Sequence, residues 1–78
     1  MARKIRIVRK RNPGCWGMAY PGKRMIEIDP ECAEDTLIDI ACHEVLHVEI
    51  PDLDESAVDR AARSIADVLW RLGFRQDE

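Results

Sequence analysis

The sequence has no apolar run long enough to span a membrane, so we expect no membrane partner. Positive residues near its start are not followed by an apolar segment, which predicts that there is no signal peptide. The three cysteines are an odd number and form no C-x-x-C pair, which favours a reduced, intracellular protein. The net charge of −3 gives no general drive to bind nucleic acid, and we expect no nucleic-acid partner.

The chain also lacks repeats, a linker and low-complexity segments, so residues 1–78 are expected to form a single domain. Its apolar fraction of 46% is ordinary for a globular protein. A length of 78 residues is close to the lower limit for folding alone. A bound metal ion is one way in which so small a core gains stability.

Alternating apolar and polar residues, separated by turn signals, predict three strands in the first part of the chain. The predicted strands span residues 4–9, 15–20 and 24–29. A turn at residues 12–14 follows the first strand, and Pro-Gly-Lys at 21–23 makes a hairpin of the other two. In the last strand, Ile26 and Ile28 are expected to face the core while Glu27 faces solvent.

A first helix is predicted from a segment without glycine or proline that extends to Val48. Its start is expected at Asp29, which would act as the N-cap, with Pro30 and Glu31 in the first turn. Apolar residues recur along it at intervals of three and four and form one stripe, namely Leu37, Ala41, Val45 and Val48.

A second helix is predicted from about residue 54 to residue 72, with Gly73 as the residue that ends it. The side chains expected on its buried face are Val58, Ala61, Ala62, Ile65, Leu69 and Leu72. The order of these elements predicts an α+β fold, in which a small three-stranded, mainly antiparallel sheet packs on two helices.

The middle of the chain carries its only two histidines, in the segment His43-Glu44-Val45-Leu46-His47. Residues four apart on a helix lie on one face about one turn apart, so both imidazoles can bind the same metal ion. Glu44 projects to the side of that pair, and from there its carboxylate can reach a water molecule without being a ligand. This spacing predicts a metal site on the first helix.

Two histidines do not complete a zinc site, because a catalytic zinc ion takes three protein ligands and leaves a fourth position open. The start of the second helix offers Glu55, with Asp59 and Asp54 as alternatives. Glu55 and Asp59 share one helix face, so one could bind the metal while the other supports a ligand. The competing interpretation for Glu55 is a capping box in which Asp52 is the cap, and we favour the ligand.

These residues resemble the gluzincin branch of zinc metallopeptidases, in which H-E-x-x-H on one helix is completed by a glutamate on the next. His43, His47 and Glu55 occupy those positions here. The nearest look-alikes are small phage and prophage proteins. The resemblance implies a minimal zincin-like core, a Zn²⁺ cofactor, a peptide or protein substrate, and a location in the cytoplasm of a bacterial or phage-infected cell. It also implies peptide hydrolysis by zinc-activated water, with Glu44 as general base and then general acid.

Two further residues are expected to assist this chemistry. Asp39 lies one helical turn before His43 and could orient that imidazole through its ring N–H. Tyr20, the only tyrosine, lies on the predicted hairpin and is a candidate donor to the oxyanion. An ordinary strand aromatic is the competing interpretation for Tyr20. An exposed edge of the hairpin could hold an extended peptide as an added strand.

A second class of function fits the same residues. The protein could be a zinc-stabilised binding module without catalytic activity, because so small a chain has little room for a deep substrate cleft. A purely structural zinc site would be closed by a fourth protein ligand, for which Cys15 and Cys32 are the candidates. Such a site has no use for a glutamate at position 44, and we therefore favour the peptidase.

Overall fold

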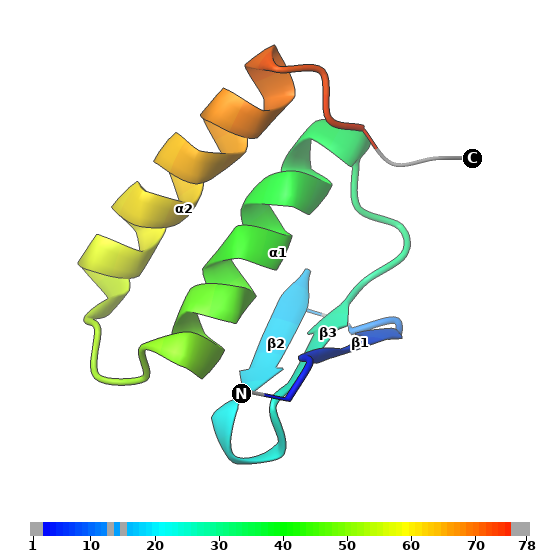
Figure 1. The fold of residues 1–78 in the computed structure, drawn as a ribbon. Helices are drawn as coiled ribbons and strands as arrows, with labels where there is room; N and C mark the ends of the chain where they lie inside the picture. The colour runs from blue at the N-terminus through cyan, green and yellow to red at the C-terminus, as the bar shows by residue number, and fades with distance from the viewer. Residues whose placement is uncertain (1–2, 13, 15, 76–78) are drawn as a thin grey trace.

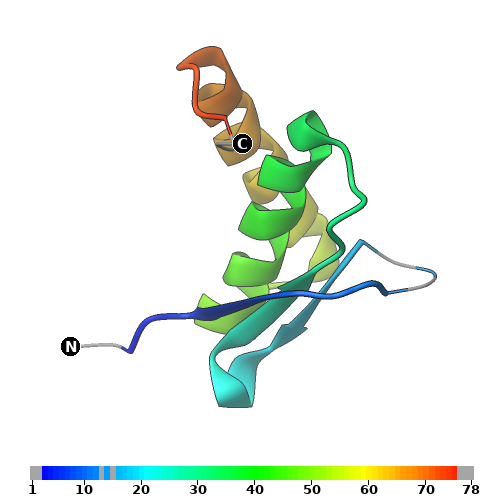
Figure 2. The same ribbon diagram turned by 90° about the vertical axis from the view of Figure 1, so that its right-hand side faces the viewer.

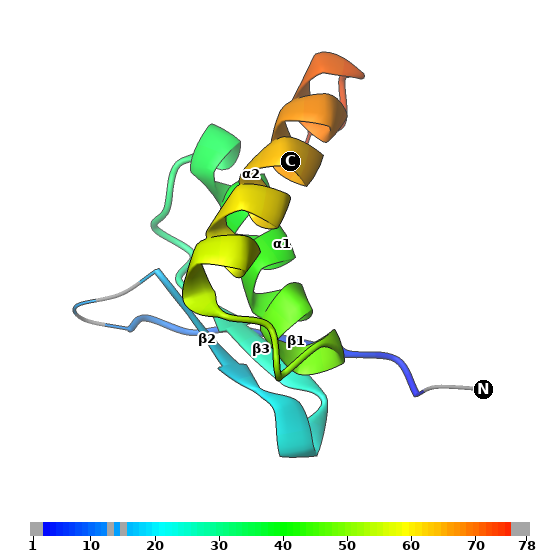
Figure 3. The same ribbon diagram turned by 90° about the vertical axis from the view of Figure 1, so that its left-hand side faces the viewer.

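The computed structural model describes residues 3–12, 14 and 16–75 and confirms the α+β class. The described elements are β1 (Arg6–Arg9), β2 (Gly17–Tyr20), the short 3-10 helix η1 (Pro21–Lys23), β3 (Met25–Ile28), α1 (Glu34–Glu49) and α2 (Glu55–Arg71). Helix α1 packs against α2 on one side and against β2 and β3 on the other (Figure 1). In the turned views the strands meet the C-terminal half of α1 (Figures 2 and 3).

The sheet has the order β1-β3-β2, so β3 is the central strand. The predicted hairpin is confirmed, because β2 and β3 pair antiparallel. The expectation of a mainly antiparallel sheet is wrong in one respect: β1 pairs with β3 in parallel, and the sheet is mixed. All four residues of β3 are buried, because a strand with a neighbour on both edges is the one best shielded from water.

The hydrophobic core between the sheet and α1 is built on Ile26 and Ile28 of β3 and Val48 of α1. The two isoleucines face α1, as the alternation along the strand predicted. Glu27, however, does not face open solvent, because only 7% of its surface is exposed. Its carboxylate accepts hydrogen bonds from Asn12 Nδ2 (3.3 Å) and from the Tyr20 hydroxyl (3.1 Å), which satisfy it on the sheet face opposite α1.

Helix α1 begins later than its sequence signals predicted. Its first residue is Glu34 and its N-cap is Ala33, whose side chain makes no capping hydrogen bond. Asp29 is not the cap, because its carboxylate accepts from the backbone N–H groups of Asn12 (3.1 Å) and Glu31 (2.8 Å). These bonds stabilise a turn at the end of β3 and hold the pKa of Asp29 below its ordinary value.

Helix α2 buries only part of the face that was predicted, which includes Val58 and Ala62. Its buried residues are Val58, Ala62 and Ala66, which are four apart. Ile65 and Leu72 were expected to be buried, but 43% and 69% of their surfaces are exposed. Small alanines allow the two helix backbones to approach closely, and this packing outweighs the preference of the larger side chains for burial. The end of α2 is as predicted, since Gly73 follows it with a positive φ of 93° and the Phe74 N–H bonds to the Leu69 carbonyl.

Candidate metal site

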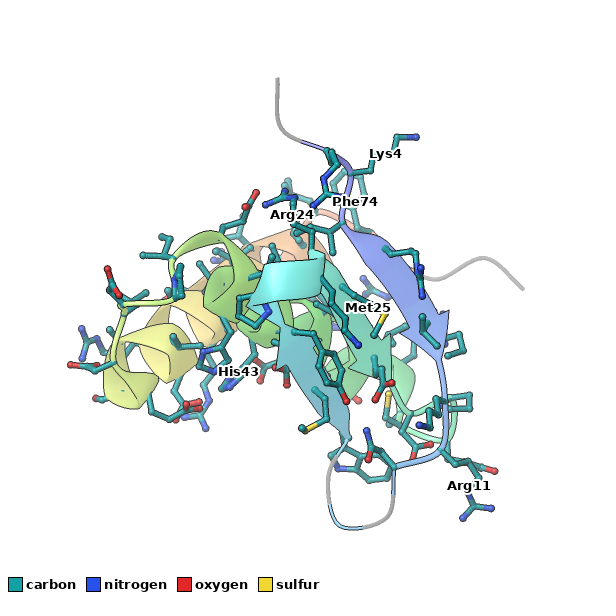
Figure 4. The ribbon with its side chains drawn as sticks, turned by 90° about the horizontal axis from the view of Figure 1, so that it is seen from below. Lys4, Arg11, Arg24, Met25, His43 and Phe74 are labelled. Atoms are coloured by element: carbon teal, nitrogen blue, oxygen red, sulfur yellow. The ribbon has the colours of Figure 1, made fainter. Side chains whose placement is uncertain are left out.

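Helix α1 places His43 and His47 one turn apart on the side that faces the start of α2. Their Nε2 atoms are 3.1 Å apart, and their rings meet edge to face with centroids 4.8 Å apart. Both rings are largely but not fully covered, with 21% and 26% of the side chains exposed. Figure 4 shows His43 between the first turns of α2 and strand β2. The site is therefore open on one side.

Glu55 is the first residue of α2 and faces both histidines. Its Oε1 lies 2.8 Å from His43 Nε2, and its Oε2 lies 3.2 Å from His47 Nε2. The connection from residue 50 to residue 54 is short, so the first turn of α2 must lie beside the last turns of α1. The antiparallel packing of the helices thus brings the carboxylate to the two imidazoles.

The three groups fit a zinc ion. A tetrahedral zinc ion about 2.0–2.2 Å from its ligands separates them from one another by roughly 3.3–3.6 Å. The separations of 2.8, 3.1 and 3.2 Å are slightly shorter, so a small outward movement of these partly exposed side chains would admit the ion. Two imidazoles and one carboxylate are the ligand set of an open, catalytic zinc site.

Asp59 supports His43 from the next turn of α2. Its Oδ1 lies 3.2 Å from His43 Nδ1, on the opposite side of the ring from Glu55. A neutral imidazole that donates its Nδ1–H to Asp59 carries its lone pair on Nε2, the atom that faces His47 and Glu55. This role had been expected of Asp39, which instead lines a hollow beside His43. The carboxylate that contacts the ring comes from α2.

Glu44 lies at the junction of α1 and β2, where the Gly17 backbone approaches its side chain. Burial there raises the pKa of Glu44 above its ordinary value, and the Glu55 carboxylate raises it further, while the two histidines act in the opposite direction. Glu44 offers a carboxylate oxygen within 4.8 Å of ring nitrogens of His43 and His47, whose Nε2 atoms also face Glu55. A half-buried carboxylate next to a cluster of potential metal ligands is suited to accept a proton from water.

The alternative ligands occupy other roles or positions. Asp54 is the N-cap of α2, and its Oδ1 accepts from the Ala57 N–H at 2.7 Å. The capping box predicted with Asp52 as the cap is therefore wrong. Cys32 packs against the β3 core, where burial raises the pKa of its thiol, and it joins no cluster of potential metal ligands in the described part of the chain. Cys15 lies outside the described residues.

Tyr20 is not brought to the histidines. Its hydroxyl donates to Glu27 Oε1, and Glu27 lies on the face of the sheet that points away from α1. Successive residues of a strand alternate between faces, so Gly17 and Ala19 of β2 face α1 while Tyr20 does not. The interpretation as a strand aromatic describes this position, and an oxyanion donor has to come from another group.

Three residues near the site were not singled out in the sequence. Two shallow hollows, of about 220 and 350 Å³, meet at Gly17, His43 and Glu44. The first is also lined by Trp16, half of whose surface is exposed, and by Arg63 of α2. A glycine inside a predicted strand was the available signal for Gly17, because such glycines often mark a close approach of another backbone. Trp16 and Arg63 gave no comparable signal.

No protein family matches the chain, and no curated protein or solved structure gives a significant match. No helix among the residues that the structure describes is long and apolar enough to cross a membrane. The function must therefore be argued from the site itself.

Proposed function

We propose that this protein is a zinc-dependent peptidase with His43, His47 and Glu55 as the metal ligands. The observation that carries the proposal is the convergence of two imidazole nitrogens and one carboxylate within 3.2 Å of one another, beside the half-buried Glu44. Two imidazoles and a carboxylate brought together in this way offer three ligand atoms to one cation. An adjacent carboxylate of raised pKa is the group that distinguishes a hydrolytic site from a structural one.

A zinc ion bound at this position would supply a Lewis acid that lowers the pKa of water and polarises the scissile carbonyl. The chain supplies the proton transfers. Glu44 accepts a proton from the attacking water and delivers it to the leaving amine. Asp59 holds the His43 ring in the tautomer that ligates through Nε2.

The substrate we propose is an extended peptide lying along β2. This strand is at the edge of the sheet, and its described pairing is with β3 alone, so a peptide can add to its other side. The two hollows that meet at Glu44 would take side chains from either side of the scissile bond. Their small volumes suit a flexible segment better than a folded domain.

Glu44→Gln tests this proposal against the zinc-stabilised binding module. Glutamine keeps the shape of the side chain but cannot accept the proton, so we expect zinc content and melting temperature close to those of the wild type. Cleavage of a broad peptide library, followed by mass spectrometry, should fall by about 10²-fold or more. Wild-type protein that carries zinc and cleaves no peptide would favour the module. Cleavage that persists in the variant would refute Glu44 as the base.

A further inference from the structure

Gly17, the first residue of β2, lies close to the Ile40 and Glu44 side chains of α1. A Cβ atom at this position would lie 2.8 Å from Ile40 Cγ2, 3.0 Å from the Glu27 carbonyl oxygen and 3.2 Å from Glu44 Cγ. These distances are too short for any side chain to fit without movement of its neighbours. Glycine is thus required at position 17 for space.

The other described glycines differ. Gly14 and Gly73 have positive φ angles, of 91° and 93°, and a Cβ atom on either would meet open space. Gly22, in η1, has neither constraint. Only the glycine beside Glu44 is required by packing, and it belongs to the lining of both hollows together with His43 and Glu44.

We propose that Gly17 is a positioning residue that sets where the Glu44 carboxylate lies relative to the metal ligands. The inference rests on the proposed peptidase function. The Glu27 oxygen belongs to the backbone of the central strand and yields less readily than a side chain, so we expect a side chain at Gly17 to displace the Glu44 and Ile40 side chains. The three atoms nearest to a Cβ atom at Gly17 belong to Ile40, Glu27 and Glu44, and none of them belongs to a proposed ligand. Substitution should therefore disturb the base and spare the metal.

The test compares Gly17→Ala with Gly22→Ala, a control with the same chemical change in the same hairpin. In Gly17→Ala we expect zinc affinity to fall by less than the roughly tenfold that loss of a supporting contact costs. The value of kcat/KM should fall by about 10–10²-fold, as for a misplacement of about 1 Å, with most of the loss in kcat. Gly22→Ala should match the wild type in zinc affinity, kcat/KM and kcat. Wild-type kcat in zinc-loaded Gly17→Ala, or a zinc loss as large as the activity loss, would overturn the proposal.

A second substitution separates positioning from packing. Ile40→Ala removes the Cγ2 atom that makes the shortest contact, so Gly17→Ala should lower the melting temperature less in an Ile40→Ala background than in the wild type. The contact with Glu44 Cγ remains, and kcat should stay low. Recovery of kcat together with stability would mean that Gly17 acts through packing alone, and the proposal would be wrong.

Cobalt-loaded protein gives a readout that does not depend on peptide cleavage. The visible absorption of bound cobalt reports the groups around the ion, including Glu44. We expect Gly17→Ala to change this spectrum in the same direction as Glu44→Gln, and Gly22→Ala to leave it unchanged. An unaltered spectrum in Gly17→Ala would overturn the inference. A wild type that shows no zinc-dependent cleavage would instead refute the proposed function, and the spectrum would still decide the role of Gly17.

Discussion

Replacing the carboxylates at the start of α2 one at a time should rank them by their distance from the metal. Glu55 oxygens face both histidine Nε2 atoms, at 2.8 and 3.2 Å, whereas Asp59 contacts only Nδ1 of His43, at 3.2 Å. Glu55→Ala therefore removes a ligand, and Asp59→Ala removes a group that orients one. Loss of an orienting group typically weakens metal binding by about 10–100-fold. We expect Glu55→Ala to exceed the upper end of that range, which corresponds to about 2.7 kcal/mol of binding free energy.

Zinc affinity can be measured by competition with a chromophoric chelator, and each variant needs a matched control. Asp54→Ala removes the N-cap of α2, so it should lower the stability of the fold by about 1 kcal/mol while changing zinc affinity little. Asp67→Ala removes an exposed carboxylate from the same helix, where it pairs with Arg71, and should change neither quantity appreciably. A larger loss of affinity in Asp59→Ala or Asp54→Ala than in Glu55→Ala would refute the proposed ligand set.

Two other predictions follow from the described contacts. His43→Ala and His47→Ala should each release zinc and lower the melting temperature, because the free energy of metal binding contributes to the free energy of folding. Metal analysis and thermal unfolding with and without chelator test this prediction, and stoichiometric zinc in both variants would contradict it. Asp29 has a lowered pKa because the backbone N–H groups of Glu31 and Asn12 donate hydrogen bonds to its carboxylate. Its contribution to stability is therefore present above the ordinary aspartate pKa of about 3.9 and is lost as the pH falls through the lowered pKa. Denaturant unfolding should show Asp29→Asn to be less stable than the wild type at neutral pH, with a difference that shrinks below about pH 4, and a constant difference would be evidence against this linkage.

The features that the sequence predicted correctly are those that local patterns determine. Both helices, the β2–β3 hairpin and the termination of α2 at Gly73 follow from periodicity and turn residues. The proximity of Glu55 to His43 follows from a four-residue spacing and a short connection between two helices. Each of these signals acts over only a few residues.

The features that were predicted wrongly depend on contacts between distant segments. The parallel pairing of β1 with β3 places Lys10, after β1, and Trp16, before β2, at the same end of β3, where they bond to the backbone of Ile28 and Asp29. The late start of α1 also depends on a contact between distant segments. The Asn12 backbone N–H, 17 positions before Asp29, donates to the Asp29 carboxylate, which was expected to cap the helix. Such pairings cannot be read from a local pattern.

The rotation of α2 about its axis determines which of its residues reach the site, and the sequence predicted it only in part, through Val58 and Ala62. Val58, Ala62 and Ala66 are buried against α1, and the same side of the helix continues toward its start as Asp59 and Glu55. The face of α2 that packs on α1 thus carries apolar side chains along most of its length and carboxylates at its start, beside the histidines. A rotation that buried the larger Ile65 and Leu72 would have turned both carboxylates away from His43.

This dependence gives a prediction for a residue that touches no proposed ligand. Ala62 is fully buried between the helices, and Ala62→Leu must push α2 away from α1 at a cost of about 1–3 kcal/mol. Because Glu55 moves with α2 while the histidines stay on α1, we expect zinc affinity to fall on the order of tenfold, the lower end of the loss for a supporting group. Ile65→Leu, at an exposed position of the same helix, is the control and should change neither stability nor affinity. If Ala62→Leu destabilises the fold but binds zinc as tightly as the wild type, the helix separation does not determine the geometry of the site.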